Sequence, residues 1–306
     1  MAASGSEERQ AYIITGPTSG YGYRTALELA GHGTVVLAGR NPGRLGEVQR
    51  TIEGNGGRAV TVVGDLADPV SVRRAAGEIA ALGLPLAGLV NNAGIMQTKA
   101  TQNAQGWDMT FATDHLGPFA LTEALIPHLA DGATVVSVCS AVEDPGRRQA
   151  VISGFRGGRY ISAEASARGE WTPGGASRPG LDAYATSKQC ELAAVLAFAR
   201  ETPRLRFIAV EPGFSPATGL ARDAGAFAQF AARYVVAPLT LLIPGGTSPD
   251  RAAQVITSAV LNEPGVTGAY YGEKGQPMTG SALVQDPEFQ DRVVAETRAL
   301  LATVAA

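Results

Sequence analysis

The fold is decided near the amino terminus by the stretch Thr15-Gly16-Pro17-Thr18-Ser19-Gly20-Tyr21-Gly22. It follows a short apolar run, Ala11–Thr15, and precedes a helical pattern near residues 22–32. Glycines at this spacing let the backbone turn tightly and approach a pyrophosphate, which the N-terminus of the following helix attracts. Its place between a strand and a helix predicts a dinucleotide-binding turn rather than an ordinary loop.

Short, continuously hydrophobic runs alternate with helical patterns over the first two-thirds of the chain. Continuous hydrophobicity is typical of strands buried on both faces of a parallel sheet. The alternation predicts an α/β fold, with a single Rossmann-type, doubly wound parallel sheet of seven strands and helices on both faces. The expected strands are 11–15, 34–38, 59–63, 87–91, 134–138, 206–210 and 265–271, and the expected helices lie near 22–32, 43–54, 69–82, 108–130 and 183–201.

Composition excludes several classes of partner and site. The 306 residues are 45% hydrophobic and 17% charged with a formal net charge of -3, so a nucleic-acid partner is not expected. Two cysteines and three scattered histidines match neither a disulfide framework nor metal-ligand spacing. Residues 1–10 are polar, unlike a secretory signal, and the most apolar stretch, 234–244, is too short to span a bilayer. We therefore expect a reduced, cytoplasmic enzyme with no metal site.

Two segments interrupt the strand–helix alternation. Residues 141–183 are rich in glycine, proline and arginine and too long for a plain connection, which predicts a lid or a surface insertion. Residues 214–246 are apolar and interrupted by prolines, and we expect them to line a substrate pocket. Both follow strands at the edge where ligands bind in such folds, within one domain spanning 1–306.

Further short motifs follow the later strands in a fixed order. Asp65-Leu66 follows the third strand, Asn91-Asn92-Ala93-Gly94 closes the fourth, and Pro212-Gly213 follows the sixth. Between the last two lies Tyr184-Ala185-Thr186-Ser187-Lys188, in an expected helix. Together with the glycine-rich turn, this order resembles the short-chain dehydrogenase/reductase family over roughly residues 10–270.

The resemblance implies that a nicotinamide dinucleotide binds where these motifs meet. The cofactor contacts that it implies, together with two positions after the second strand, are Gly16, Thr18, Ser19, Gly20, Tyr21, Gly22, Arg40, Asn41, Asp65, Leu66, Asn92, Ala93, Gly94, Tyr184, Lys188, Pro212, Gly213 and Thr218.

The end of the second strand bears on the choice of cofactor. An acid there would bond the ribose hydroxyls and repel a 2′-phosphate. The chain has Gly39 at that place and Arg40 next, a planar donor suited to phosphate. The sequence therefore favours NADP(H), with an ordinary surface arginine as the alternative reading of Arg40.

Tyr184 and Lys188 are four residues apart, so a helix places both on one face. A free tyrosine, with a pKa of about 10, is a poor base at neutral pH, and a nearby ammonium lowers that pKa. By resemblance, Tyr184 exchanges the proton, Lys188 also holds the nicotinamide ribose, and Ser140 binds the substrate oxygen. Ser137, on the same strand, is the alternative serine.

The segment Phe111–Phe119 resembles retinol-dehydrogenase-like members of the family, in which an asparagine holds a water that links the active-site lysine to solvent. Here that position is Asp114, which we include among the catalytic residues. Its carboxylate could accept from such a water or directly from Lys188, or Asp114 could be structural. Pro212-Gly213 and Thr218 extend the similarity to that branch and to protochlorophyllide-reductase-like members.

The resemblance implies an NADP(H)-dependent oxidoreductase. The expected reaction is hydride transfer between nicotinamide and a carbonyl or secondary alcohol of a hydrophobic small molecule. A homodimer through the helices of 108–130 and 183–201 is also implied. Two alternatives remain: a non-redox or internally redox-cycling enzyme, such as a cyclase, epimerase or dehydratase, and an inactive NADP(H)-binding sensor.

Overall fold

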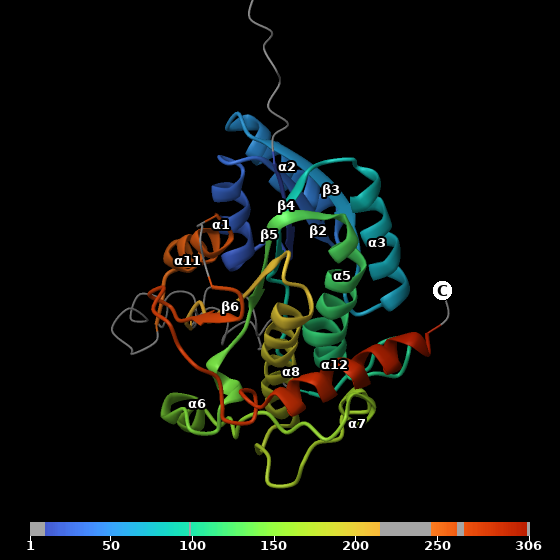
Figure 1. The fold of residues 1–306 in the computed structure, drawn as a ribbon, viewed down its shortest axis with the longest axis vertical. Coiled ribbons are helices and arrows are strands. Elements are labelled where there is room, and N and C mark those ends of the chain that lie inside the picture. Colours follow the sequence, from blue (N-terminus) through green and yellow to red (C-terminus); the bar gives the residue numbers. More distant parts are fainter. Residues whose placement is uncertain (1–9, 98, 215–245, 262–265, 305–306) are drawn as a thin grey trace, which may run out of the picture.

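The computed structural model of the chain describes residues 10–97, 99–214, 246–261 and 266–304. Seven parallel strands form one sheet in the order β3-β2-β1-β4-β5-β6-β7 (Figure 1). This confirms the predicted doubly wound sheet, and the strand order reverses between β1 and β4, where such folds bind ligands. The strands are β1 (Ala11–Thr15), β2 (Thr34–Gly39), β3 (Arg58–Val63), β4 (Leu86–Asn91), β5 (Leu129–Val138), β6 (Arg206–Val210) and β7 (Ala269–Tyr271).

Each face of the sheet has its own hydrophobic core. Along β1, Tyr12 and Ile14 face the core shared with α1, α2 and α11, whereas Ala11 and Ile13 face the one shared with α3, α5, α8 and α12. Burial on both faces explains why the strands are continuously hydrophobic. The helices are α1 (Gly20–Leu29), α2 (Pro42–Gly54), α3 (Pro69–Ala81), α4 (Met109–Phe111), α5 (Gly117–Leu125), α6 (Arg148–Ile152), α7 (Ala163–Ala167), α8 (Pro179–Glu201), α11 (Pro249–Leu261) and α12 (Pro287–Ala302).

The prediction of a single helix over residues 108–130 is wrong. The segment is divided into α4, a π-helical turn (Ala112–Leu116), α5 and a 3₁₀ turn (Ile126–His128), and β5 already begins at Leu129. Pro118 has no N–H to donate to the carbonyl of Asp114, so the α-helical hydrogen-bond pattern is interrupted here. The wider π-helical turn stands at this interruption. Single turns of π-helix within α-helices are frequent at functional sites.

Further element boundaries differ from expectation, and α8 begins at Pro179, four residues before the expected helix of 183–201. Helix α1 spans Gly20–Leu29, so the expected helix of 22–32 begins and ends too late. Strand β7 begins only at Ala269, because Gly268 has a φ of +77°, outside the strand region. Of the expected strand 265–271, residue 265 lies outside the described residues.

Residues 141–183 form a 3₁₀ turn (Ala141–Glu143), α6, α7 and the start of α8. Part of this segment is packed, since α7 contacts α12 and Tyr160 Oη donates to Glu296 at 2.6 Å. Of the expected pocket segment 214–246, only Phe214 and Gly246 belong to the described residues. No helix in the described part of the chain combines the length and the hydrophobicity needed to cross a membrane.

Candidate active site

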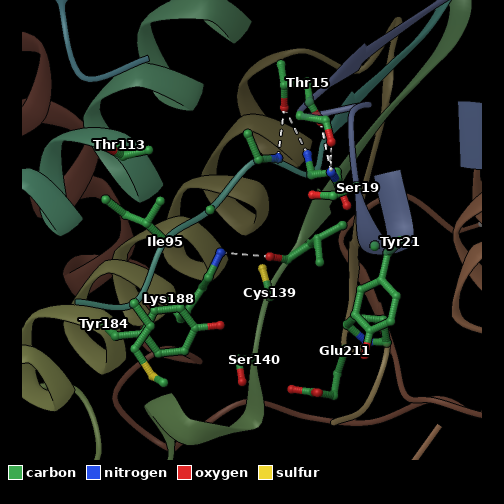
Figure 2. A pocket seen from close by; sticks show the side chains of 18 of the residues that line it. Thr15, Ser19, Tyr21, Ile95, Thr113, Cys139, Ser140, Tyr184, Lys188 and Glu211 are labelled. Carbon is green, nitrogen blue, oxygen red and sulfur yellow. Dashed lines mark hydrogen bonds between the residues drawn. The ribbon is translucent and has the colours of Figure 1, made fainter. Parts of the chain in front are cut away.

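A cavity of about 1930 Å³ lies at the carboxyl ends of the strands. It extends from the turn after β1 to the residues after β5 and β6 (Figure 2). The expected site residues that line it are Gly16, Thr18, Ser19, Gly20, Tyr21, Arg40, Asn41, Asp65, Leu66, Asn92, Ala93, Gly94, Ser140, Tyr184, Lys188, Pro212 and Gly213. Gly22 and Asp114 are buried and do not line it, and Thr218 lies outside the described residues.

The turn after β1 needs glycine at several positions. Gly16 and Gly20 have φ values of +66° and +57°, a conformation that favours glycine. A Cβ on Gly22 would lie 2.3 Å from Nδ2 of Asn92, so α1 can pack here only without a side chain. The turn therefore brings the backbone of α1's first residues to the edge of the cavity.

Thr15, which was not among the expected site residues, joins this turn to the one after β4. Its Oγ1 accepts from the N–H groups of Asn92 and Ala93, each at 3.0 Å (Figure 2). Nδ2 of Asn92 in turn donates to the carbonyl of Thr15 at 2.9 Å. The two turns on either side of the point where the strand order reverses are thus held in fixed register.

Two arginines line the cavity where β2 ends. Arg40 follows Gly39, and Arg44, which sequence reasoning missed, lies one helical turn later in α2. Neither forms an ion pair with a described residue. The side chain of Asn41 caps α2 by accepting from the N–H of Arg44 at 3.0 Å. This corner of the cavity offers positive charge suited to a phosphate.

Tyr184 and Lys188 lie on one face of α8, as expected, and Lys188 Nζ lies 5.8 Å from the centre of the Tyr184 ring. Burial raises the pKa of Tyr184 above its ordinary value, and the Lys188 ammonium opposes that rise. Lys188 Nζ donates to the carbonyl of Val138 at 2.8 Å (Figure 2). The lysine is thereby attached to the end of β5, near Ser140.

Glu191, a residue that sequence reasoning missed, is the ion-pair partner of Lys188. Its Oε2 lies 2.7 Å from Lys188 Nζ, and the two side chains are only 6% and 5% exposed. The hydroxyl of Ser137 also bonds to this carboxylate. The available signal was the spacing, because residues three apart on a helix are neighbours.

Asp114 is fully buried at the π-helical turn. Its Oδ1 accepts from the N–H of Ile95 at 2.8 Å, and its Oδ2 has no hydrogen-bond partner among the described residues. Burial raises the pKa of Asp114 to about 8, although Lys188 lowers it. Lys188 forms its ion pair with Glu191, and no ion pair between Lys188 and Asp114 is seen among the described residues.

Ser140, rather than Ser137, faces the cavity. Ser137 does not line it and bonds to Glu191 instead. The Ser140 hydroxyl bonds to the buried carboxylate of Glu211, which also accepts from the N–H groups of Ala141 and of Gly213, the latter at 3.1 Å. Glu211, also missed from the sequence, thus ties the end of β5 to the turn after β6.

The cavity wall beyond Ser140 contains several apolar side chains and also the charged Arg147 and Arg148. Residues 141–155 contribute much of it, including Ile152 and Phe155. Ile152 is 75% exposed and Phe214 60% exposed, although both are large and hydrophobic. Apolar side chains that line a cavity and remain exposed to solvent are suited to an apolar ligand.

Known proteins with similar sequences cover either part or most of the chain. A family model described as short chain dehydrogenase matches residues 10–152. Mouse polyprenol dehydrogenase is 41% identical over 138 residues, and human retinol dehydrogenase 11 is 35% identical over 140 residues. These two matches cover 42% and 44% of this chain but only 41% and 44% of the relatives' own lengths.

Other matches extend over most of the fold. A crystal structure of an uncharacterised protein from Mycobacterium paratuberculosis aligns with a TM-score of 0.68 and 29% identity, covering 95% of this chain and 93% of that one. A short-chain dehydrogenase/reductase of Armillaria gallica is 30% identical over 254 residues, which are 78% of this chain and 76% of that protein. The chain therefore belongs to the short-chain dehydrogenase/reductase family.

Proposed function

We propose that this enzyme uses NADP(H) to interconvert a carbonyl and a secondary alcohol on a hydrophobic small molecule. One observation carries the proposal. Ser140, Tyr184 and Lys188 line the same cavity as the glycine-rich turn after β1. A group bound along that turn therefore reaches the three side chains that resemble the family's catalytic set.

The residues present fit the cofactor. The turn of positive-φ glycines leads into the N-terminus of α1, an arrangement that attracts a pyrophosphate. Arg40 and Arg44, which are not ion-paired to described residues, are suited to a 2′-phosphate, and β2 ends in Gly39 rather than an acid. This combination favours NADP(H) over NAD(H).

The bound cofactor supplies or accepts the hydride. Tyr184 donates a proton to the carbonyl oxygen in reduction and takes it back in oxidation. Lys188 lies on the same helix face, and its ammonium favours the phenolate over the phenol. Ser140 faces the substrate oxygen from the end of β5. Its oxygen can accept from a substrate alcohol while its proton is donated to Glu211, and to donate to a carbonyl the hydroxyl must turn away from Glu211. Hydrogen bonds to Glu191 and the Val138 carbonyl hold Lys188, and the Tyr184 ring packs against Phe155, so these two groups need little reorganisation during the reaction.

A hydrophobic substrate is favoured by the cavity wall. Ile152 and Phe155 belong to the segment 141–183, which we propose forms the wall of the substrate-binding part of the cavity. The names of two relatives refer to polyprenol and retinol, which are hydrophobic alcohols. Their matches cover less than half of those proteins, and both named alcohols are primary, so they support a hydrophobic substrate and neither a secondary alcohol nor the substrate's identity.

Replacement of Tyr184 by phenylalanine tests the proposal. Tyr184→Phe should remove nearly all turnover of a panel of hydrophobic ketones and alcohols, followed by nicotinamide absorbance. NADP(H) affinity should stay within a few-fold, since only the proton path is lost. Substantial remaining turnover would mean that the proton comes from another group. NADP(H) binding without any turnover by the unaltered protein would instead favour a sensor.

A further inference from the structure

Two buried acids lie near a single buried cation at the site. Glu191 and Asp114 are 5% and 0% exposed, and both interact electrostatically with Lys188. Burial of a charge is costly unless an opposite charge compensates it. One ammonium can neutralise one carboxylate, so both acids are not expected to be ionised together at neutral pH.

The hydrogen bonds distinguish the two acids. Glu191 receives the ammonium of Lys188 at 2.7 Å and the hydroxyl of Ser137. Asp114 receives one backbone N–H, from Ile95, and its other oxygen has no hydrogen-bond partner among the described residues. Donors favour the ionised form of a carboxyl, and burial without donors favours the neutral form.

We propose that Glu191 is the anion that positions Lys188, and that Asp114 is a neutral carboxylic acid. Lys188 Nζ then has two of its three hydrogens assigned, one to Glu191 and one to the carbonyl of Val138. The third is free to act toward Tyr184 or the cofactor. The catalytic meaning of this arrangement rests on the proposed function of Tyr184.

The electrostatics around the pair agree with a neutral Asp114. Burial also raises the pKa of Glu191, but the Lys188 ammonium and the Ser137 hydroxyl, both hydrogen-bonded to it, lower that pKa. Burial raises the pKa of Asp114 to about 8. Burial alone would lower the pKa of Lys188, but Glu191 raises it above its ordinary value. The other titratable groups that face Lys188 or Asp114 are Tyr184 on the same helix as Lys188, Cys139 after β5, Asp108 at the start of α4, and His115 in the π-helical turn.

Infrared spectroscopy tests which acid holds the proton. A protonated carboxyl has a C=O stretch distinct from that of a carboxylate. The spectrum of the unaltered protein minus that of Asp114→Asn, at neutral pH, should show the protonated band of Asp114. The spectrum of Glu191→Gln minus that of Glu191→Gln plus Asp114→Asn should show a carboxylate band for Asp114 in place of the protonated band. In the absence of Glu191, Asp114 becomes the remaining carboxyl partner of Lys188.

Glu143→Gln is the matched control. Glu143 is a fully buried acid that accepts from the N–H and hydroxyl of Ser281, and its pKa is also raised by burial. Since it does not pair with Lys188, its replacement should leave the Asp114 band unchanged. An Asp114 band that persists in Glu191→Gln, or is missing from the unaltered protein, would overturn the proposal.

A second variant covers the case in which Glu191→Gln does not fold. In Lys188→Met, Glu191 loses its partner and should gain a protonated band, seen by comparison with Lys188→Met plus Glu191→Gln. The Asp114 band should already be present before the lysine is removed. A new Asp114 band in place of a Glu191 band would reverse the assignment. These spectra need no turnover, so they remain informative if the proposed redox function fails.

Discussion

Burial raises the pKa of Asp114 from its ordinary value of 3.8 to about 8. Between these two values the folded protein keeps a proton that the unfolded chain has lost. Stability from this group is therefore fully present below the lower pKa and is lost as the pH rises through the higher one. Asp114 thus makes stability depend on pH between its ordinary pKa and about 8.

Asp114→Asn should remove this dependence. As the pH rises from about 5 to about 9, the melting temperature of the unaltered protein should fall relative to that of the variant. Thermal unfolding at a series of pH values measures the difference, with the exposed acid Glu47→Gln as the control. If the melting temperatures of the two proteins change in parallel from about pH 5 to about pH 9, Asp114 is already ionised in the folded protein at about pH 5.

Cofactor choice depends on the residues at the end of β2. A Cβ on Gly39 would have its nearest neighbour, a methyl of Leu45, at 3.4 Å, so a side chain fits there. Gly39→Asp with Arg40→Ala should weaken NADP(H) binding by about 1–3 kcal/mol, because charge-assisted hydrogen bonds are lost, and should strengthen NAD(H) relative to it. Arg44→Ala should weaken NADP(H) selectively as well.

Titration of both cofactors measures these changes. Arg58→Ala is a suitable control. Arg58 is exposed at the start of β3, and the cavity lies at the other, carboxyl ends of the strands. Equal losses for NADP(H) and NAD(H) would mean that Arg40 and Arg44 support the fold and do not read the phosphate.

At the scale of elements, Glu211 joins the ends of two neighbouring strands. Its carboxylate accepts from Ser140, Ala141 and Gly213, which lie after β5 and β6. A glutamine has one acceptor oxygen, so Glu211→Gln leaves one backbone donor unpaired, at a cost of about 1–3 kcal/mol in unfolding free energy.

The same replacement should lower turnover more than substrate affinity, because it loosens Ser140. Since Ser140 and Glu211 act as a pair, the effect on turnover should be smaller in the Ser140→Ala background. A double-mutant cycle in turnover and in chemical denaturation separates the two roles. Additive effects on turnover would show that Glu211 stabilises the turns without positioning the serine.

The elements that were predicted well are those with a strong local pattern. Each strand from β1 to β6 contains a mostly apolar run, and motif order placed the site at their carboxyl ends. The start of β5 was missed because residues 130–132 are exposed there and carry no strand pattern. Helix α12 was not predicted, although Asp286 and Pro287 form an ordinary helix start.

Within the site, Thr15 and Glu211 act through tertiary contacts, whereas Glu191 pairs with Lys188 within α8. Thr15, Glu191 and Glu211 bond to groups 77, 3 and 70 residues away. Only the Lys188–Glu191 spacing is visible along a helix, and a solvent-exposed pair would have the same spacing. Burial is what gives this pair its importance, and burial follows from how α8 packs on the sheet.

At the scale of the whole molecule, α12 connects parts that are distant in the sequence. It packs against α8 and crosses it at an angle (Figure 1), and Arg298 pairs with Glu123 of α5 at 2.6 Å and with Glu201 of α8 at 2.7 Å. These pairs are partly exposed, so each contributes little to stability. The apolar contacts of α12 with α8 and with the segment 141–183 matter more.

Phe289 is the apolar contact that best tests this role. It is 3% exposed, and its ring packs edge-on against Tyr160 of the segment 141–183, with 5.7 Å between ring centres. Phe289→Ala leaves a cavity and should lower the unfolding free energy by about 3–5 kcal/mol. Because we propose that residues 1–306 form a single domain, the loss should appear in one cooperative transition.

Chemical denaturation followed by fluorescence and by circular dichroism measures that loss. Val266→Ala, at a residue that is 73% exposed, should leave stability nearly unchanged. NADP(H) affinity of the folded variant should also be retained, since α12 lies away from the turn after β1. If Phe289→Ala instead gives a separate early transition, α12 and the segment that it holds unfold independently of the sheet.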